Sequence, residues 1–259
     1  MPLADVLLLA VVQGLTEFLP VSSSGHLVIV EALLASQTDD AAKLTVNVML
    51  HAGTLFAVLA VYWSRIWRLL GSDAGLIGKI VVGTLPAAVV GIAVKKLLPG
   101  LASQTLLTGL MLWVTGAMLL AGSRCPDGST TYQRVTYAQA LAIGTIQAIA
   151  ILPGISRSGA TIVAGVALGL RRDAAATFSF LLAIPVIGGA SLIEARELLT
   201  HDGPSISLAV LLVGMLVAFL VGLVALRWLL RWLEQGRLHY FAWWCFPLGA
   251  AVVVWQWLG

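Results

Sequence analysis

The chain has 259 residues, and its 15 Lys and Arg against 12 Asp and Glu give a net charge of +3. Hydrophobic residues make up 59% of the sequence and charged residues 10%, whereas about a quarter of a typical soluble domain is charged. So few charges cannot cover a soluble fold of this length, and the same numbers exclude intrinsic disorder. The apolar residues form long unbroken runs, unlike the alternation of a porin-like barrel, and the basic residues are too scattered for a nucleic-acid-binding face. The sequence therefore predicts an all-α polytopic membrane protein.

The first apolar region, residues 3–34, is interrupted by Glu17, Pro20 and the run VSSSGH at 21–26. Each half is too short to cross a bilayer at about 1.5 Å per residue. Polar backbone at membrane depth is stable only where protein buries it or where it lines a wet cavity. We therefore expect a re-entrant helix–loop–helix hairpin, and the alternative is a kinked helix that crosses the whole membrane.

The rest of the chain repeats two kinds of element. Six uninterrupted apolar runs are long enough to span a bilayer core, which takes about 20 residues. One further broken region separates the first three runs from the last three. In chain order these are spans at 45–63, 76–94 and 104–122, the broken region at 137–170, and spans at 174–193, 205–226 and 240–258. Pro153 and the run GISRSG at 154–159 interrupt the broken region, so it predicts a second re-entrant hairpin.

An internal repeat relates the two hairpins. At a constant offset of 134 residues, four residues fall on identical ones: Gln13 on Gln147, Ser22 on Ser156, Ser24 on Ser158 and Gly25 on Gly159. The single domain, 1–259, then consists of repeat 1 (about 1–122) and repeat 2 (about 135–259), each a hairpin followed by three spans. Three crossings are an odd number, so the second unit is inverted, and inverted repeats bring their broken helices together near the bilayer midplane.

The distribution of basic residues orients this layout. Ten of them fall on one side: Arg65, Arg68, Lys79, Arg124, Arg134, Arg171, Arg172, Arg227, Arg231 and Arg237. Four fall on the other: Lys43, Lys95, Lys96 and Arg196. The positive-inside rule makes the first side cytoplasmic and places both termini outside. The stretch RWLLRWLEQGR at 227–237 is then expected to lie at the cytoplasmic interface.

Few titratable residues interrupt the apolar segments. Placing such a residue in a membrane costs free energy, so those that are present usually have a functional role. Glu17 and Arg157 belong to opposite hairpins, so converging hairpins place them in one pocket. Each Ser/Gly loop leads into a helix whose N-terminal N–H groups suit an anion, and a guanidinium can hold phosphate with two N–H groups. The polar residues expected to line this oxyanion site are Gln13, Ser22, Ser24, Gly25, Ser156, Ser158, Gly159 and Thr161.

Hydrolysis would also need a nucleophile and a proton carrier, which Ser23, His26 and Glu17 could supply. A purely structural Glu17–Arg157 lock is the alternative. We expect His51, inside a span, to form hydrogen bonds between helices and not to act in catalysis.

Two long motifs, GLTEFLPVSSSGHL (14–27) and PGISRSGATI (153–162), resemble the signature segments of the undecaprenyl-diphosphate phosphatase family, also called the bacitracin-resistance protein family. The similarity extends over nearly the whole chain, including SFLLAIP at 179–185. It implies hydrolysis of undecaprenyl diphosphate to undecaprenyl phosphate and inorganic phosphate, which recycles the lipid carrier for peptidoglycan synthesis and confers bacitracin resistance. It also implies a multi-pass protein of the bacterial cytoplasmic (inner) membrane, surrounded by membrane lipids, whose active site opens to the outer, periplasmic face.

The resemblance assigns roles to individual residues. Glu17 matches the acidic residue of a (Glu/Gln)-x-x-x-Glu motif, and Gln13 its variable first position. Ser23 and His26 match residues implicated in catalysis, and Arg157 the phosphate-binding arginine. We slightly favour His26 as nucleophile or proton carrier, because a serine needs an adjacent base.

The family's activity is associated with Mg or Ca ions, for which Glu17 is the candidate ligand, although the amide of Gln13 weakens a model with two carboxylates. The alternative function is a transporter or flippase for polyprenyl phosphate, which inverted repeats also serve. The sequence leaves open whether the protein forms a homo-oligomer.

Overall fold

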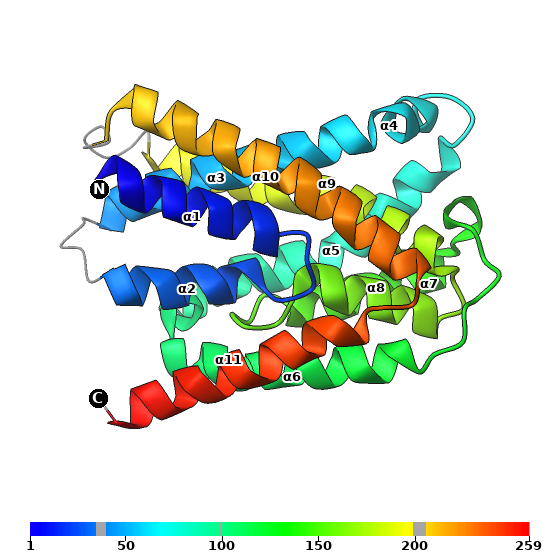
Figure 1. Ribbon diagram of the computed structural model, residues 1–259. Coiled ribbons are helices and arrows are strands. Elements are labelled where there is room, and N and C mark those ends of the chain that lie inside the picture. Colours follow the sequence, from blue (N-terminus) through cyan, green and yellow to red (C-terminus); the bar gives the residue numbers. More distant parts are fainter. Residues whose placement is uncertain (35–39, 99, 199–205, 259) are drawn as a thin grey trace.

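The computed structural model describes residues 1–34, 40–98, 100–198 and 206–258, and these ranges contain eleven α-helices (Figure 1). Six of the helices are long and apolar enough to cross a membrane. They are α3 (Asp40–Val61), α5 (Gly75–Leu97), α6 (Thr105–Ser123), α9 (Arg172–Leu198), α10 (Leu208–Glu234) and α11 (His239–Leu258). The expectation of an all-α polytopic membrane protein is confirmed.

The ends of several spans differ from the predicted ones. Helix α10 continues to Glu234, although the span was expected to end at residue 226, so most of the Trp/Arg stretch is helical. This helix stops before Gly236, whose φ of 70° lies in the left-handed region that glycine favours. A short helix, α4 (Trp63–Leu69), directly follows α3. The predicted first residue of the 205–226 span lies outside the described residues.

Four short helices form the two predicted broken regions: α1 (Leu3–Thr16), α2 (Ser23–Leu34), α7 (Tyr137–Ile149) and α8 (Arg157–Ala167). They have 14, 12, 13 and 11 residues, which at about 1.5 Å per residue is too short for a bilayer core. In Figure 1, α1 and α2 lie toward the end of the molecule that holds both termini, and α7 and α8 toward the opposite end. Their re-entrant placement in a bilayer stays a prediction.

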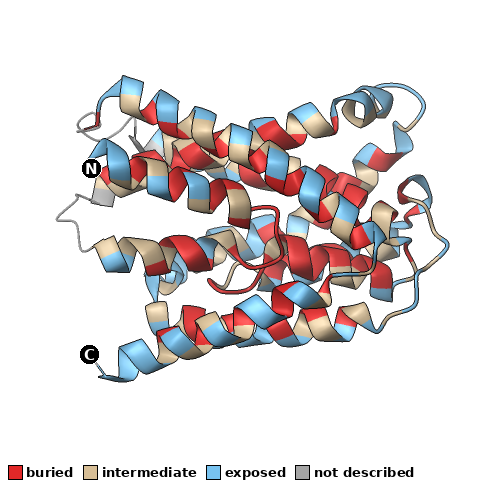
Figure 2. Ribbon diagram, viewed as in Figure 1, coloured by how far each residue is buried: buried red, intermediate tan, exposed pale blue. Residues whose placement is uncertain are grey.

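The longer helices enclose the loops at the tips of these pairs. Helix α1 packs against α10, α7 against α5, and α6 against α11. The loop 17–22 between α1 and α2 is buried at the centre of the molecule (Figure 2). Phe18 anchors it, because its ring contacts that of Phe180 in α9 at a centroid distance of 5.8 Å, and Gly222 of α10 leaves room for the same ring. The loop is thus fixed by packing from two directions.

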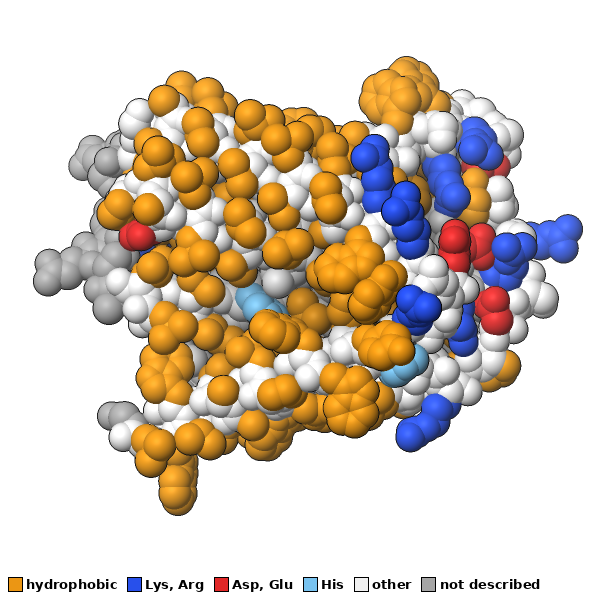
Figure 3. All heavy atoms as spheres, viewed as in Figure 1, with side chains coloured by type: hydrophobic (Ala, Val, Ile, Leu, Met, Phe, Trp, Pro, Cys, Tyr) orange, Lys and Arg blue, Asp and Glu red, His pale blue; other side chains and the backbone are white. Residues whose placement is uncertain are grey.

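The surface has the character expected of a membrane protein. Hydrophobic side chains cover most of the face in Figure 3, and Lys and Arg side chains gather at the end where α4 and α7 lie. Many large apolar residues of the spans are exposed, such as Leu85, Val89 and Leu220. An apolar surface of this extent is stable only in contact with lipid or protein.

Candidate active site

The loops of the two helix pairs meet at Ser22, the residue before α2. Its φ of 72° is left-handed, a conformation that is strained for a residue with a side chain. Hydrogen bonds hold it there, because Ser22 Oγ accepts from the backbone N–H groups of Gly25 and Gly154, each at 3.2 Å. The second of these bonds joins the loop 17–22 directly to the loop 150–156.

The second loop is held from α6. Thr115 Oγ1 donates to the carbonyl oxygen of Gly154 at 2.7 Å and accepts from the N–H of Ser156 at 3.0 Å. Ser156 in turn caps α8, because its Oγ accepts from the N–H of Gly159 at 3.1 Å. One buried threonine therefore fixes the backbone on which Arg157 is mounted.

Small residues let the two loops touch. A Cβ on Gly25 would lie 3.1 Å from Gly154 Cα, and a Cβ on Gly159 would lie 3.1 Å from Pro20 Cβ. These two contacts correspond under the offset of 134 residues, as do the hydroxyl pairs Ser22–Ser24 (3.3 Å) and Ser156–Ser158 (3.2 Å). Such paired contacts are what an inverted repeat leads one to expect, and the repeat itself stays a prediction.

Glu17 lies at the centre of the polar cluster and is only 7% exposed. Its Oε1 accepts from Arg157 Nη2 at 2.5 Å. Its Oε2 accepts from Ser23 Oγ at 2.6 Å and from Gln13 Nε2 at 3.1 Å. The predicted convergence of the carboxylate and the guanidinium is therefore present, and a serine hydroxyl joins them.

A cavity of about 330 Å³ opens beside this cluster. The polar residues that line it are Thr16, Glu17, Ser23, Ser24, His51, Ser156, Arg157, Ser191 and Glu194. Arg157 Nη1 is buried and has no hydrogen-bond partner within the described part of the chain. A buried donor without a partner is rare in proteins, so this guanidinium has an N–H available for an oxyanion.

His26 is placed differently from Ser23. Its Nδ1 lies 2.8 Å from the carbonyl oxygen of Ser22, and Trp244 Nε1 donates to its Nε2 at 2.9 Å. The ring is buried, and His26 does not line the cavity. Both ring nitrogens are thus engaged within the protein, and the ring supports the strained Ser22 backbone next to Ser23. Its expected catalytic role stays a prediction.

Several residues expected to bind substrate have contacts within the protein and lie away from the cavity. Thr161 Oγ1 lies 2.5 Å from Ser179 Oγ and donates to the carbonyl oxygen of Arg157 at 2.8 Å. Ser22, Gly25 and Gly159 are buried in the contacts between the two loops, and Ser158 is buried beside Ser156. Like Thr161 and Gln13, these residues do not line the cavity. Their role as substrate ligands stays untested.

His51 is the clearest departure from the sequence analysis. We expected a hydrogen bond between helices, but its Nδ1 lies 2.8 Å from the carbonyl oxygen of Asn47 in its own helix. Its Nε2 lies 4.0 Å from Glu17 Oε2 at the cavity wall. The sequence signal was present, since His51 is a titratable residue within an apolar span. Ser191 and Glu194, near the end of α9, gave no such signal.

The cluster does not fit a resident metal ion. The described residues contain no group of three His, Cys, Asp or Glu placed to hold one. Protein donors occupy both oxygens of Glu17, and the amide of Gln13 supplies one of them. Because Mg²⁺ and Ca²⁺ need several oxygen ligands, these side chains do not form a cation cage.

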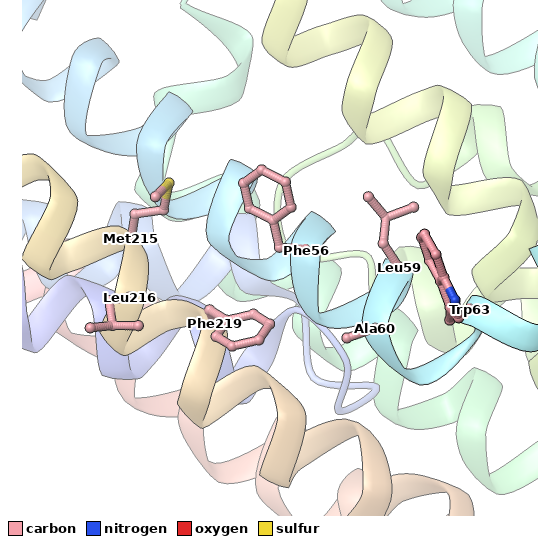
Figure 4. A pocket seen from close by; sticks show the side chains of 7 residues that line it. All are labelled: Phe56, Leu59, Ala60, Trp63, Met215, Leu216 and Phe219. Carbon is pink, nitrogen blue, oxygen red and sulfur yellow. The ribbon is translucent and has the colours of Figure 1, made fainter.

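A second hollow lies on the outside of α3 and α10. It measures about 510 Å³, and Figure 4 shows the side chains that line it: Phe56, Leu59, Ala60, Trp63, Met215, Leu216 and Phe219. All seven residues are apolar or aromatic, so this groove suits hydrocarbon and offers no group for chemistry.

Comparison with known proteins identifies the family. The family model of bacitracin resistance protein BacA matches residues 6–251. The chain belongs to this family. It is 50% identical over 254 residues to an undecaprenyl-diphosphatase of Rhodopirellula baltica, with 97% of each chain covered. It is 40% identical to an undecaprenyl-diphosphatase of Desulfatibacillum aliphaticivorans (96% and 97% covered) and 38% identical to one of Halothermothrix orenii (98% of each).

Proposed function

We propose that this chain hydrolyses undecaprenyl diphosphate to undecaprenyl phosphate and inorganic phosphate. One observation carries the proposal. Ser23 Oγ donates at 2.6 Å to a buried carboxylate that is paired with an arginine, and all three residues line one cavity. A hydroxyl with an adjacent base is the arrangement that activates a serine nucleophile. The names of the BacA relatives agree with a phosphatase and do not favour a flippase.

In the first step, Ser23 Oγ attacks the terminal phosphorus of the diphosphate. A bond forms between Oγ and phosphorus, the bond to the bridging oxygen breaks, and undecaprenyl phosphate leaves with that oxygen. The proton of Ser23 passes to Glu17 Oε2, the atom that already accepts its hydrogen bond. In the second step, water attacks the phosphoserine, inorganic phosphate leaves, and Ser23 regains a proton. Because Ser23 has its base at hydrogen-bond distance, this geometry favours it over His26 as nucleophile.

Positive charge in the cavity comes from two sources. Arg157 presents an Nη1 that has no partner in the described part of the chain toward the phosphoryl oxygens that gain charge in the transition state. The first turns of α2 and α8 begin at Ser23 and Arg157, so their N-terminal N–H groups lie near the same site. This combination stabilises a phosphoryl group without a resident cation. A Mg or Ca ion is proposed to arrive with the oxygens of the diphosphate, as part of the substrate.

We place the protein in the bacterial inner membrane, with the end that carries α4 and α7 in the cytoplasm. The gathering of Lys and Arg at that end supports this orientation. The loop 17–22, which contributes Glu17 to the cavity, then belongs to the helix pair α1 and α2, which lies toward the outer face. Hydrolysis on that face would recycle the lipid carrier for peptidoglycan synthesis, and removal of undecaprenyl diphosphate would confer bacitracin resistance.

Phosphate release by the purified protein in detergent tests the function. We expect inorganic phosphate to form from undecaprenyl diphosphate, whereas a flippase would release none. The nucleophile is tested by a rapid quench in acid. A serine phosphate survives acid and a phosphohistidine does not, so an acid-stable label on the chain supports Ser23, and an acid-labile label overturns this assignment.

A further inference from the structure

His51 has one ring nitrogen fixed and the other directed toward the catalytic cluster. The carbonyl oxygen of Asn47 can only accept, so the Nδ1 at 2.8 Å carries the proton in the neutral ring. Nε2 then has a free lone pair, and it is the nitrogen that lies 4.0 Å from Glu17 Oε2. With a side chain that is 30% exposed at the cavity wall, His51 can also reach water.

Glu17 alone is a poor final acceptor for the serine proton. Arg157 Nη2 at 2.5 Å stabilises the charged carboxylate, and the amide of Gln13 donates to the oxygen that would receive the proton. A neutral Glu17 would lose most of the ion pair with a buried guanidinium, which is costly in a dry environment. A second acceptor is therefore needed within reach of Glu17 Oε2, and an imidazole suits this role near neutral pH.

We propose that His51 is the final acceptor of the Ser23 proton, and this inference rests on the proposed phosphatase function. As Ser23 Oγ bonds to phosphorus, its proton moves to Glu17 Oε2 and on to His51 Nε2 through one bridging water, because the two atoms are 4.0 Å apart. The imidazolium then faces a carboxylate that is charged again. When water attacks the phosphoserine, one proton of that water goes to phosphate or solvent, and the proton held on His51 returns through Glu17 to Ser23 Oγ.

Charged groups from several elements lie around His51. Glu17 faces it from the loop after α1, and Glu194 of α9 lines the same cavity. Glu31 of α2 accepts a hydrogen bond at 3.1 Å from Nδ2 of Asn47, the residue whose carbonyl oxygen contacts His51 Nδ1. Arg157 of α8 is the opposing cation, and it is already paired with Glu17. His26 cannot accept the proton in the same way, because its Nε2 already accepts a hydrogen bond from Trp244 Nε1.

The test is the pH dependence of kcat for phosphate release, measured with purified protein in detergent. In the wild type, kcat should rise with pH on the acid side as the imidazole loses its proton. His51→Gln should lower kcat about 10²-fold and remove this acid limb, with little change in KM. His239→Gln is the matched control, because His239 begins α11 and does not line the cavity; it should leave kcat and the limb unchanged.

A second variant separates proton transfer from a structural role. His51→Ala should lose activity and regain a measurable part of it with added imidazole, which a structural role would not produce; melting temperatures show whether both variants are folded. Activity of His51→Gln within three-fold of wild type, a retained acid limb, or no rescue by imidazole would each overturn the inference while the proposed function stands. A wild type that releases no phosphate overturns the proposed function and this inference together.

Discussion

Arg157 Nη2 lies 2.5 Å from Glu17 Oε1, although the two residues are 140 positions apart in the chain. They belong to different helix pairs, and each side chain is nearly buried. A structural lock and a catalytic pair would both place the groups in contact. What favours a catalytic pair is the cavity: Ser23 lines it and donates to Glu17, and Arg157 Nη1 has no hydrogen-bond partner among the described residues.

Arg157→Lys should not preserve function. Lysine keeps the charge but replaces a planar fork of donors with one ammonium group, so Glu17 and the phosphoryl oxygens can no longer be held together. We expect kcat to fall about 10²-fold or more, which is about 2.7 kcal/mol of transition-state stabilisation. Steady-state kinetics with a polyprenyl diphosphate measures it. A kcat within a few-fold of wild type would assign Arg157 to balancing Glu17 alone.

Glu17→Gln keeps the size of the side chain and removes its charge. Ser23 then loses its base, and we expect kcat to fall by about 10² or more. A double-mutant cycle with Arg157→Gln, read on both melting temperature and kcat, separates catalysis from structure. A structural lock predicts that stability falls in each single variant and partly recovers in the double variant, with kcat following stability. Catalysis predicts that kcat does not recover.

Ser23→Ala should abolish turnover while the cavity still binds substrate. The carboxylate of Glu17 keeps its bonds to Arg157 and Gln13, so the fold should change little. Binding of a polyprenyl diphosphate, measured by isothermal titration calorimetry, should be retained. Residual turnover well above the uncatalysed rate would point to attack by water or by a histidine.

Thr115→Val should destabilise the protein by about 1–3 kcal/mol, because it leaves the buried N–H of Ser156 and the carbonyl oxygen of Gly154 without their partner. Thr145→Val is the matched control. Its hydroxyl donates to the carbonyl oxygen of Leu141, one turn earlier on an exposed face of the same helix, so the change should be small. Melting temperatures compare the two variants, and equal shifts would show that Thr115 does not fix the second loop.

Gly25→Ala tests the contact between the loops. The new Cβ would lie 3.1 Å from both Gly154 Cα and Thr108 Cγ2, which is tighter than an ordinary van der Waals contact. We expect the second loop to shift by a few tenths of an ångström relative to the first, and with it the spacing of Ser23 and Arg157. We expect a loss of kcat of about 10-fold or more, because small misplacements of reacting groups are costly. Gly189→Ala, where a Cβ meets nothing within 4 Å, should leave kcat unchanged.

The sequence alone determined the membrane class, the spans, the two broken helix pairs and the identity of Glu17, Ser23 and Arg157 as site candidates. The physical reason is that a bilayer penalises charges and broken backbone strongly, so run length and interruptions can be read without packing. Helix ends were less certain. Apolar periodicity does not mark where α10 stops, and its last turns contain Trp and Arg that a helix accommodates equally well.

Only the tertiary structure decided which of the two histidines within the broken or spanning segments faces the cavity. The direction of a side chain depends on how its helix is rotated against its neighbours, which no local pattern encodes. His26 follows Ser23 by one helical turn, yet its ring points to Trp244 of α11, a residue 218 positions away. His51 was a titratable residue within a span for which the sequence predicted a structural role, but the packing of α3 brings its Nε2 to 4.0 Å from Glu17 Oε2.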